Sequence, residues 1–242
     1  MQLIYGFDNI PQLHHAVVTV GSYDGLHKGH QILISRLIDR AKSRGGVSVV
    51  LTFEPHPRIT LCQDENLKLL TSLEEKQLLL ERMGVDYLLV IPFDRAFSQL
   101  SNQQFVQNYI IGKLGAEEMV IGYNHHFGRD KSGDYNYLCS SQPALAVTQV
   151  EQQTVESDKV SSTVIRGVIS AGDMATAARL LGHNYIVVGN TDVYGTLTTD
   201  RYKLLPPPAE YSAVVNGVEQ SIKIGDGEIY TDKPNQRVTI EL

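Results

Sequence analysis

The chain has 242 residues, of which 42% are hydrophobic and 20% charged, and its formal net charge is −6. This composition is typical of a globular protein of one or two domains, and the negative balance argues against a polyanion partner such as nucleic acid. The two cysteines, Cys62 and Cys139, fit neither a disulfide framework nor a metal knuckle and indicate reduced thiols. No signal peptide and no apolar run of membrane-spanning length is present, so we expect a cytoplasmic protein without a membrane partner.

Apolar, β-branched runs alternate with helical periodicity up to about residue 184. Strands are predicted over residues 16–20, 47–53, 87–91, 119–122 and 145–150. Helices are predicted over residues 31–43, 72–83, 101–114 and 173–181, with capping boxes at Ser72/Glu75 and Ser101/Gln104. The alternation predicts an α/β fold with a doubly wound parallel sheet, whose ligands bind beyond the carboxyl ends of the strands.

After about residue 184 the pattern changes to short, partly alternating runs that predict strands. These runs lie at residues 185–188, 196–202, 211–215, 220–224, 228–230 and 237–242. The pair Asn216-Gly217 between two of them predicts a hairpin. We therefore expect one domain over residues 1–183 and a small all-β domain over residues 184–242, built as an open barrel or sandwich.

The most informative motif is the run GSYDGLHKGH at residues 21–30, between a predicted strand and a predicted helix. His27 and His30 are three residues apart at a helix start, so they lie on one face, where the backbone amides favour an anion. Gly25 and Gly29 let the backbone approach a ligand closely. The run predicts a phosphate site whose imidazoles stabilise charge while a leaving group departs; the alternative is two surface histidines on an ordinary helix.

Polar residues also follow three other predicted strands. Residues 54–58 (EPHPR) present a carboxylate, an imidazole and a guanidinium, or else form a rigid polar loop. Residues 121–134 mix glycine, aromatic and basic side chains, which suits a stacked ring with phosphates nearby; the adjacent His125 and His126 make a poor zinc site. The hydroxyls of residues 161–163 open a helix, where they bind backbone amides or a phosphate, with Arg166 adding a positive charge.

Taken together, these motifs resemble those of the bacterial FAD synthetases, the bifunctional riboflavin kinase/FMN adenylyltransferases. The likeness runs from about residue 17 to residue 185 and rests on GSYDGLHKGH, TFEPHPR, VIGYNHHFGRDKSGD, SSTVIR and GDMATAARLLGHNY. The first motif resembles the HxGH motif of the nucleotidylyltransferase superfamily, which implies a Rossmann-like domain of that type. The resemblance implies transfer of AMP from ATP to FMN in riboflavin and FAD biosynthesis, giving FAD and pyrophosphate, with Mg²⁺.

The resemblance also implies the roles of individual residues. The catalytic groups would be His27, His30 and Arg166, with the two histidines on the ATP phosphates in the transition state. The ATP side would comprise Gly21, Tyr23, Gly29, Ser161, Ser162 and Thr163, whose three hydroxyls would hold the leaving pyrophosphate. The flavin side would comprise His56, Pro57, Arg58, Asn124 and Phe127. Neither a metal ligand nor an oligomeric state is assigned.

Two segments depart from the family pattern. His125 and His126 stand where the family more often has aromatic or arginine residues. Residues 189–200 lack the Gly-Arg stretch and the Pro-Thr-Ala-Asn turn of the kinase, so residues 184–242 are interpreted as a degenerate, shortened kinase barrel. The leading hypothesis is an FMN adenylyltransferase alone, with ATP and FMN as its small-molecule partners. The alternatives are a bifunctional enzyme that also phosphorylates riboflavin, another HxGH nucleotidylyltransferase, or a non-catalytic flavin-binding protein.

Overall fold

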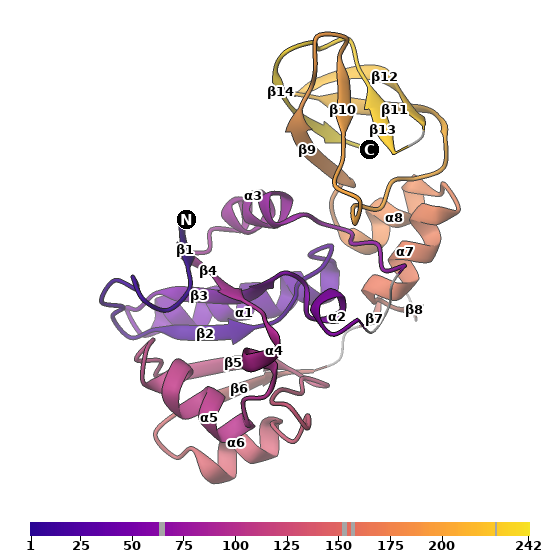
Figure 1. The fold of residues 1–242 in the computed structure, drawn as a ribbon. Coiled ribbons are helices and arrows are strands. Elements are labelled where there is room, and N and C mark those ends of the chain that lie inside the picture. The colour runs from indigo at the N-terminus through magenta and orange to yellow at the C-terminus, as the bar shows by residue number, and fades with distance from the viewer. Residues whose placement is uncertain (63–65, 152–153, 156–157, 226) are drawn as a thin grey trace. The chain divides into compact units, whose positions relative to one another are not determined.

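The computed structural model describes residues 1–62, 66–151, 154–155, 158–225 and 227–242 (Figure 1). Their contacts form two compact units, each with its own sheet and its own core. Unit 1 comprises Met1–Tyr23, Gly29–Glu65 and Gln77–Gln153. Unit 2 comprises Asp24–Lys28, Asn66–Lys76 and Thr154–Leu242.

The sheet of unit 1 has six strands in the order β1-β4-β3-β2-β5-β6, and every neighbouring pair is parallel. The strands are β1 (Gln2–Tyr5), β2 (Val17–Val20), β3 (Ser48–Glu54), β4 (Tyr87–Pro92), β5 (Glu118–Gly122) and β6 (Ala146–Val150). The predicted parallel sheet is confirmed, and β1 is an additional edge strand. The chain runs from β2 outward to β3 and β4, then returns to β5 on the other side, so the carboxyl ends of β2 and β5 flank the switch point where such sheets bind ligands.

In the described part of the chain, seven helical segments follow or connect these strands in chain order. They are α1 (Lys28–Ser43), α2 (Pro57–Thr60), α3 (Leu73–Met83), α4 (Arg95–Ser98), α5 (Asn102–Gln104), the π-helix η1 (Phe105–Ile111) and α6 (Tyr135–Ser141). Both predicted capping boxes are present: Ser72 with Glu75, and Ser101 with Gln104. The helix expected over residues 101–114 differs in kind, because half of that range is the π-helix, after which Gly112 N–H bonds the Gln107 carbonyl at 2.9 Å.

A buried carboxylate secures the amino end of β5 in unit 1. The side chain of Glu118 has no exposed surface, and it accepts hydrogen bonds from Arg40 at 2.7 and 3.0 Å and from Arg44 at 2.6 Å. Thr148 donates a further bond at 2.7 Å. Burial by itself would raise the pKa of Glu118, but the bonds from Arg40, Thr148 and Arg44 bring that pKa below its ordinary value. The ion pair is thus a structural anchor at the edge opposite the ligand-binding end of the sheet.

Unit 2 combines two helices with an antiparallel six-stranded sheet of order β10-β13-β12-β11-β14-β9. Its elements are α7 (Ser162–Ser170), α8 (Met174–Leu181), β9 (Ile186–Asn190), β10 (Thr196–Thr198), β11 (Ala209–Val215), β12 (Val218–Gly225), β13 (Glu228–Tyr230) and β14 (Arg237–Glu241), with β7 (Thr154–Val155) and β8 (Asp158–Lys159) paired separately. The predicted hairpin at Asn216-Gly217 is confirmed, since both residues have positive φ, 50° and 83°, between β11 and β12. A Cβ on Gly189 of β9 would lie 2.4 Å from Leu197 of β10, so the two ends of the sheet meet and the sheet is barrel-like.

The helices and strands of unit 2 share one core. Ile165 and Leu180, from α7 and α8, are buried in the same cluster as Val215 and Ile240 from the sheet. The boundary expected between residues 183 and 184 falls where helices give way to strands, while the contacts place α7 and α8 with the strands. The division into domains 1–183 and 184–242 stays a prediction about folding units.

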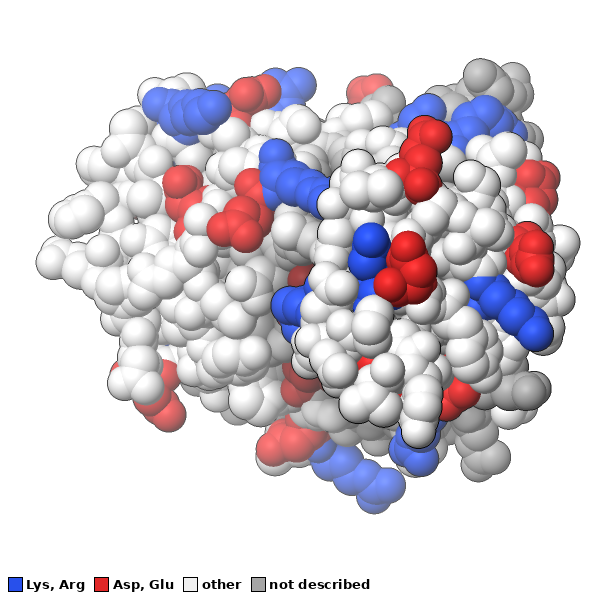
Figure 2. Space-filling model, turned by 90° about the horizontal axis from the view of Figure 1, so that it is seen from above, with Lys and Arg blue, Asp and Glu red and all other residues white. Residues whose placement is uncertain are grey.

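Two surface properties bear on partners. In the part of the chain that the structure describes, none of the helices is both long and apolar enough to cross a membrane. On the face drawn in Figure 2, basic and acidic side chains are interspersed among uncharged ones, and neither sign dominates that face.

Candidate active site

Tyr23 fixes the ring of His30 in unit 1. The Tyr23 side chain is buried, and its hydroxyl lies 2.6 Å from Thr19 Oγ1, which itself donates to the Val120 carbonyl at 2.7 Å. Tyr23 must therefore be the donor in the first bond, and burial raises its pKa. Its ring meets the His30 ring edge-on, with centroids 5.3 Å apart. A Cβ on Gly21 would lie 2.9 Å from the Tyr23 ring, so glycine is required there for this packing.

His27 precedes α1 directly and is only 7% exposed. Burial lowers the pKa of His27 to about 4, because the imidazolium ion is disfavoured away from water. The ring is therefore neutral at pH 7. A neutral imidazole at the start of a helix can still donate one N–H to a phosphate oxygen, beside the exposed amides of the helix N-terminus.

The predicted phosphate-binding residues of α7 take part in hydrogen bonds within unit 2. Ser161 is the N-cap of α7, and its hydroxyl accepts from Val164 N–H at 3.4 Å. Ser162 donates its hydroxyl to the Asp24 carbonyl at 2.9 Å. Arg166 donates from Nη2 to Asp24 Oδ2 at 2.5 Å and from Nε to the Lys68 carbonyl at 2.6 Å. Thr163 is exposed, and the roles of all four toward a nucleotide stay predictions.

A pocket of about 410 Å³ opens at the carboxyl edge of the sheet in unit 1. It is lined by residues at the ends of β2 and β3 and in the segments after β2, β3, β4 and β5: Val20, Gly21, Ser22, Phe53, Pro57, Leu61, Phe93, Phe97, Ser98, Leu100, Phe105, His125, His126, Phe127, Gly128, Arg129 and Lys131. Three predicted site residues, Gly21, Pro57 and Phe127, are therefore brought together. The volume is in the range of small-molecule sites, and the position matches the switch point of the sheet.

Aromatic rings form much of the pocket wall. Phe53 and Phe93 lie edge to face at 5.3 Å, and Phe97 contacts Phe93 at 5.9 Å and Phe105 at 6.0 Å. Phe127 contacts Phe105 at 5.9 Å. Such rings offer a large apolar area and flat faces, which suits a planar, aromatic ligand.

His125 stands at the same pocket with its ring 5.7 Å from that of Phe127. Burial, and then the neighbouring His126, lower the pKa of His125 to about 4. His125 is therefore neutral at pH 7 and adds a polar but uncharged edge to an apolar wall.

The other predicted flavin-side residues lie outside this lining. His56 is buried as the N-cap of α2, where its Nδ1 accepts from Arg58 N–H at 3.2 Å. The imidazole thus supports the loop that carries Pro57. Asn124 is exposed, and its assignment to the site, like those of His56 and Arg58, stays a prediction.

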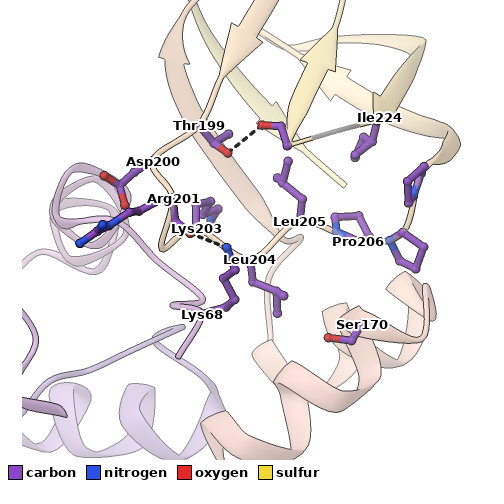
Figure 3. Close-up of a pocket in the computed structure, with 14 residues that line it drawn as sticks. Lys68, Ser170, Thr199, Asp200, Arg201, Lys203, Leu204, Leu205, Pro206 and Ile224 are labelled. Carbon is purple, nitrogen blue, oxygen red and sulfur yellow. Dashed lines mark hydrogen bonds between the residues drawn. The ribbon is translucent and has the colours of Figure 1, made fainter. Parts of the chain in front are cut away.

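Unit 2 has a pocket of its own, of about 360 Å³ (Figure 3). Apolar side chains such as Leu205, Pro206 and Ile224 form much of its lining. Thr199 donates to the Gly227 carbonyl at 3.1 Å across one side, and Lys68 donates to the Arg201 carbonyl. The lining residues of this pocket include none of the predicted site residues.

Sequence reasoning missed two features of the site. The first is the set of rings Phe53, Phe93, Phe97 and Phe105; the signal available was a phenylalanine at or just after the ends of two predicted strands. The second is Asp24, which lies inside the HxGH run but whose partners are 46 residues or more away in the chain. No local pattern indicates such partners.

Fold and site together define an α/β domain of the HxGH nucleotidylyltransferase class, followed by a β domain. The model of the FAD synthetase family matches residues 9–164, which is more than half of the chain. The chain belongs to the FAD synthetase family.

Several known proteins are similar to this chain. Relatives described as bifunctional riboflavin kinase/FMN adenylyltransferases come from Listeria monocytogenes (37% identical over 196 residues), Pseudomonas fluorescens (35% over 192) and Escherichia coli (31% over 193). The matches cover 76%, 78% and 78% of this chain but only 62%, 61% and 62% of the relatives. A crystal structure described as a macrolide-efflux protein from Streptococcus pneumoniae is similar with a TM-score of 0.85 and 25% identity, covering 100% of this chain and 89% of that one.

Proposed function

We propose that the protein is an FMN adenylyltransferase, which transfers AMP from ATP to FMN. A phosphate oxygen of FMN forms a bond to the α-phosphorus of ATP, and the bond from that phosphorus to the bridging oxygen of the β-phosphate breaks. FAD and pyrophosphate are the products. The proposal places the protein in FAD biosynthesis, and with both cysteines reduced and exposed it fits the cytoplasm.

One observation carries this proposal above the others. The aromatic pocket of unit 1 begins at Val20, Gly21 and Ser22, the residues that lead from β2 into the HxGH run. The pocket and His30 therefore belong to the same unit, and residues 20–22 of the pocket continue directly along the chain into the segment that carries the predicted phosphate donors. An enzyme using a small polar acceptor has no need of a wall of phenylalanine rings. A pure flavin-binding protein has no need of the histidine pair.

For this reaction the protein has mainly to align the two substrates and to stabilise the charge that develops on the phosphates. A phosphate monoester is already an anion at neutral pH, so a strong general base is not required. His27 and His30 would donate to the ATP phosphates as charge develops, and Arg166 would add a fixed positive charge. Magnesium would arrive as the Mg·ATP substrate, bridging phosphates and keeping several waters. Among the described residues there is no group of three or more His, Cys, Asp or Glu that could hold a metal.

We also propose that riboflavin kinase activity is absent. Phosphoryl transfer needs a site that holds the γ-phosphate, magnesium and the acceptor together. The pocket of unit 2 has one carboxylate among its described lining residues, Asp200, and that carboxylate accepts the Tyr202 N–H at 2.7 Å. The lining also includes three basic side chains, Lys68, Arg201 and Lys203. Each of them donates to a group of the protein: the Arg201 carbonyl, the Tyr202 hydroxyl and Glu75, respectively.

The test is incubation of the purified protein with FMN and Mg·ATP, with flavins separated by chromatography. FAD and pyrophosphate should appear in equal amounts, and riboflavin in place of FMN should yield no product because it lacks the attacking phosphate. CTP in place of ATP tests the neighbouring class of nucleotidylyltransferases. If no FAD forms above a control without enzyme, the proposed function is wrong.

A further inference from the structure

Asp24 is a buried carboxylate at the centre of the HxGH run, and none of the assignments above gives it a role. It is 5% exposed. Its Oδ1 accepts the backbone N–H groups of Leu70 at 2.8 Å and of Thr71 at 3.0 Å, and its Oδ2 accepts Arg166 Nη2 at 2.5 Å. One side chain thus ties its own turn to two other segments of unit 2. A buried charge satisfied in this way is held in a single geometry.

The backbone on either side of the Asp24 side chain is also held. The Asp24 carbonyl accepts from Ser162 Oγ at 2.9 Å, and Gly25 N–H donates to Thr71 Oγ1 at 3.0 Å. The Gly25 carbonyl lies 3.1 Å from His183 Nε2. The turn at residues 24–28 is therefore fixed to residues 70–71, to α7 and to the end of α8.

This turn needs such anchors because its backbone is strained. Leu26, a branched residue, has φ of +42°, in the left-handed region that such side chains rarely adopt. Gly25 has φ of +81°, and a Cβ there would lie 2.6 Å from Leu70 Cδ1, so the turn packs tightly on that residue. His27 follows immediately. Its ring can keep a productive orientation only if the turn keeps this conformation.

We propose that Asp24 is the positioning residue of the transfer reaction: by tying Arg166 to residues 70–71, it holds the turn that orients His27. The proposal rests on the proposed function. It also gives Arg166 a second task, since the Nε and Nη2 edges of its guanidinium bind the protein and its side chain keeps only 16% exposure. Because two donors of the planar guanidinium bind two different acceptors, the Asp24 carboxylate and the Lys68 carbonyl, the direction of the group is fixed as well as its charge.

The first test replaces Asp24→Asn, which keeps an oxygen for the amides of Leu70 and Thr71 but removes the charge facing Arg166. We expect kcat to fall about 10²-fold, the usual cost of a displacement of about 1 Å at a reacting group, while KM for FMN stays near the wild-type value. The control is Glu118→Gln, which removes another buried carboxylate paired with arginine, at the amino end of β5 in unit 1. That variant should lose stability and keep kcat, measured well below the melting temperature of each protein.

The second test asks whether Asp24 acts through His27. In a His27→Ala background, Asp24→Asn should change kcat little. If Asp24 acts through His27, the effects of the two substitutions on kcat are not additive. Fully additive losses would overturn the proposal, and so would a wild-type kcat in the Asp24→Asn enzyme. Thr71→Val, which removes the acceptor of Gly25 N–H, serves if Asp24→Asn does not fold, and it should also lower kcat without moving KM for FMN.

The wild-type assay separates the two proposals. If the wild-type protein makes FAD and the Asp24 and Thr71 variants make it equally fast, only the positioning role is wrong. If the wild-type protein makes no FAD from FMN and Mg·ATP, the proposed function is wrong, and the positioning role of Asp24 is then wrong as well.

Discussion

Replacing Lys203→Met should destabilise unit 2 strongly, because the ammonium group of Lys203 is fully used in a buried site. Lys203 Nζ donates to Glu75 Oε2 at 2.7 Å and to the carbonyls of Leu70 and Ile186, both at 2.8 Å. It also lies 4.3 Å from the centre of the Tyr185 ring. Burial lowers the pKa of Lys203, and the charge of Glu75 acts in the opposite direction.

The expected loss follows from what the substitution leaves behind. Methionine fills the space of the lysine stem, so the loss comes from electrostatics and hydrogen bonding and not from a cavity. Breaking a buried ion pair costs about 3–5 kcal/mol, because the remaining carboxylate of Glu75 is left buried without its partner. For a chain of this size about 1 kcal/mol shifts the melting temperature by roughly 2–4 °C, so we expect a drop of roughly 10 °C.

The control is an exposed ion pair at Glu74, the residue next to Glu75. Arg237 pairs with Glu74, but both side chains are about half exposed, 48% and 53%. Arg237→Met should therefore cost at most about 1 kcal/mol. Adding Glu75→Gln to Lys203→Met should restore part of the stability, since the amide oxygen can still accept Val188 N–H, which Glu75 Oε1 accepts at 3.1 Å in the native protein. Melting temperatures are measured by circular dichroism for the wild type, for the two single variants and for the double variant. Equal melting temperatures for Lys203→Met and Arg237→Met would refute this reasoning.

Three further predictions concern the chemistry. His27→Ala and His30→Ala should each lower kcat by about 10²–10³-fold with FMN binding unchanged, as measured by turnover and by flavin fluorescence titration; weakened FMN binding with normal turnover would contradict the placement of the histidines on ATP. The pKa values of His27 and His125 are lowered to about 4, so the unfolded chain binds more protons than the folded one between about pH 6.5 and pH 4. The free energy of unfolding, measured with urea, should therefore fall as the pH drops through that window. His125→Phe should make this fall with pH less steep. Finally, riboflavin with Mg·ATP and no FMN should yield neither FMN nor FAD, and accumulation at a rate comparable to adenylylation would show that a kinase site exists.

The parallel sheet could be predicted because its strands are continuous apolar runs, as in the fully buried β2. The edge strand β1 could not, since its four residues are exposed, half-buried, buried and exposed in turn, which forms no readable pattern. The π-helix at Phe105–Ile111 could not be predicted from the sequence for another reason. Apolar spacing indicates a helix there, but it does not distinguish hydrogen bonds four residues apart from bonds five residues apart.

The candidate site divides in the same way. The HxGH run and the loops after β3 and β5 carry their chemistry in consecutive residues, so the sequence indicates them directly. The aromatic pocket is assembled from single phenylalanines on several segments, and Asp24 meets Leu70 and Arg166 only because the chain folds back. Contacts over 46 and 142 residues have no local sequence signal.

Leu70 connects the β domain to the HxGH turn, which gives the C-terminal residues a task that needs no kinase chemistry. Its N–H donates to Asp24 and its carbonyl accepts from Lys203, so one peptide segment joins the two buried charges. The neighbouring Leu69 is bonded on both sides to the same stretch of the β domain, donating to the Tyr202 carbonyl at 2.6 Å and accepting from Leu204 N–H at 2.9 Å. Disturbing Lys203 should therefore lower kcat as well as stability, even below the melting transition. On this argument the β domain holds residues 69–71, and through them Asp24, in the position that the proposed transfer of AMP would require.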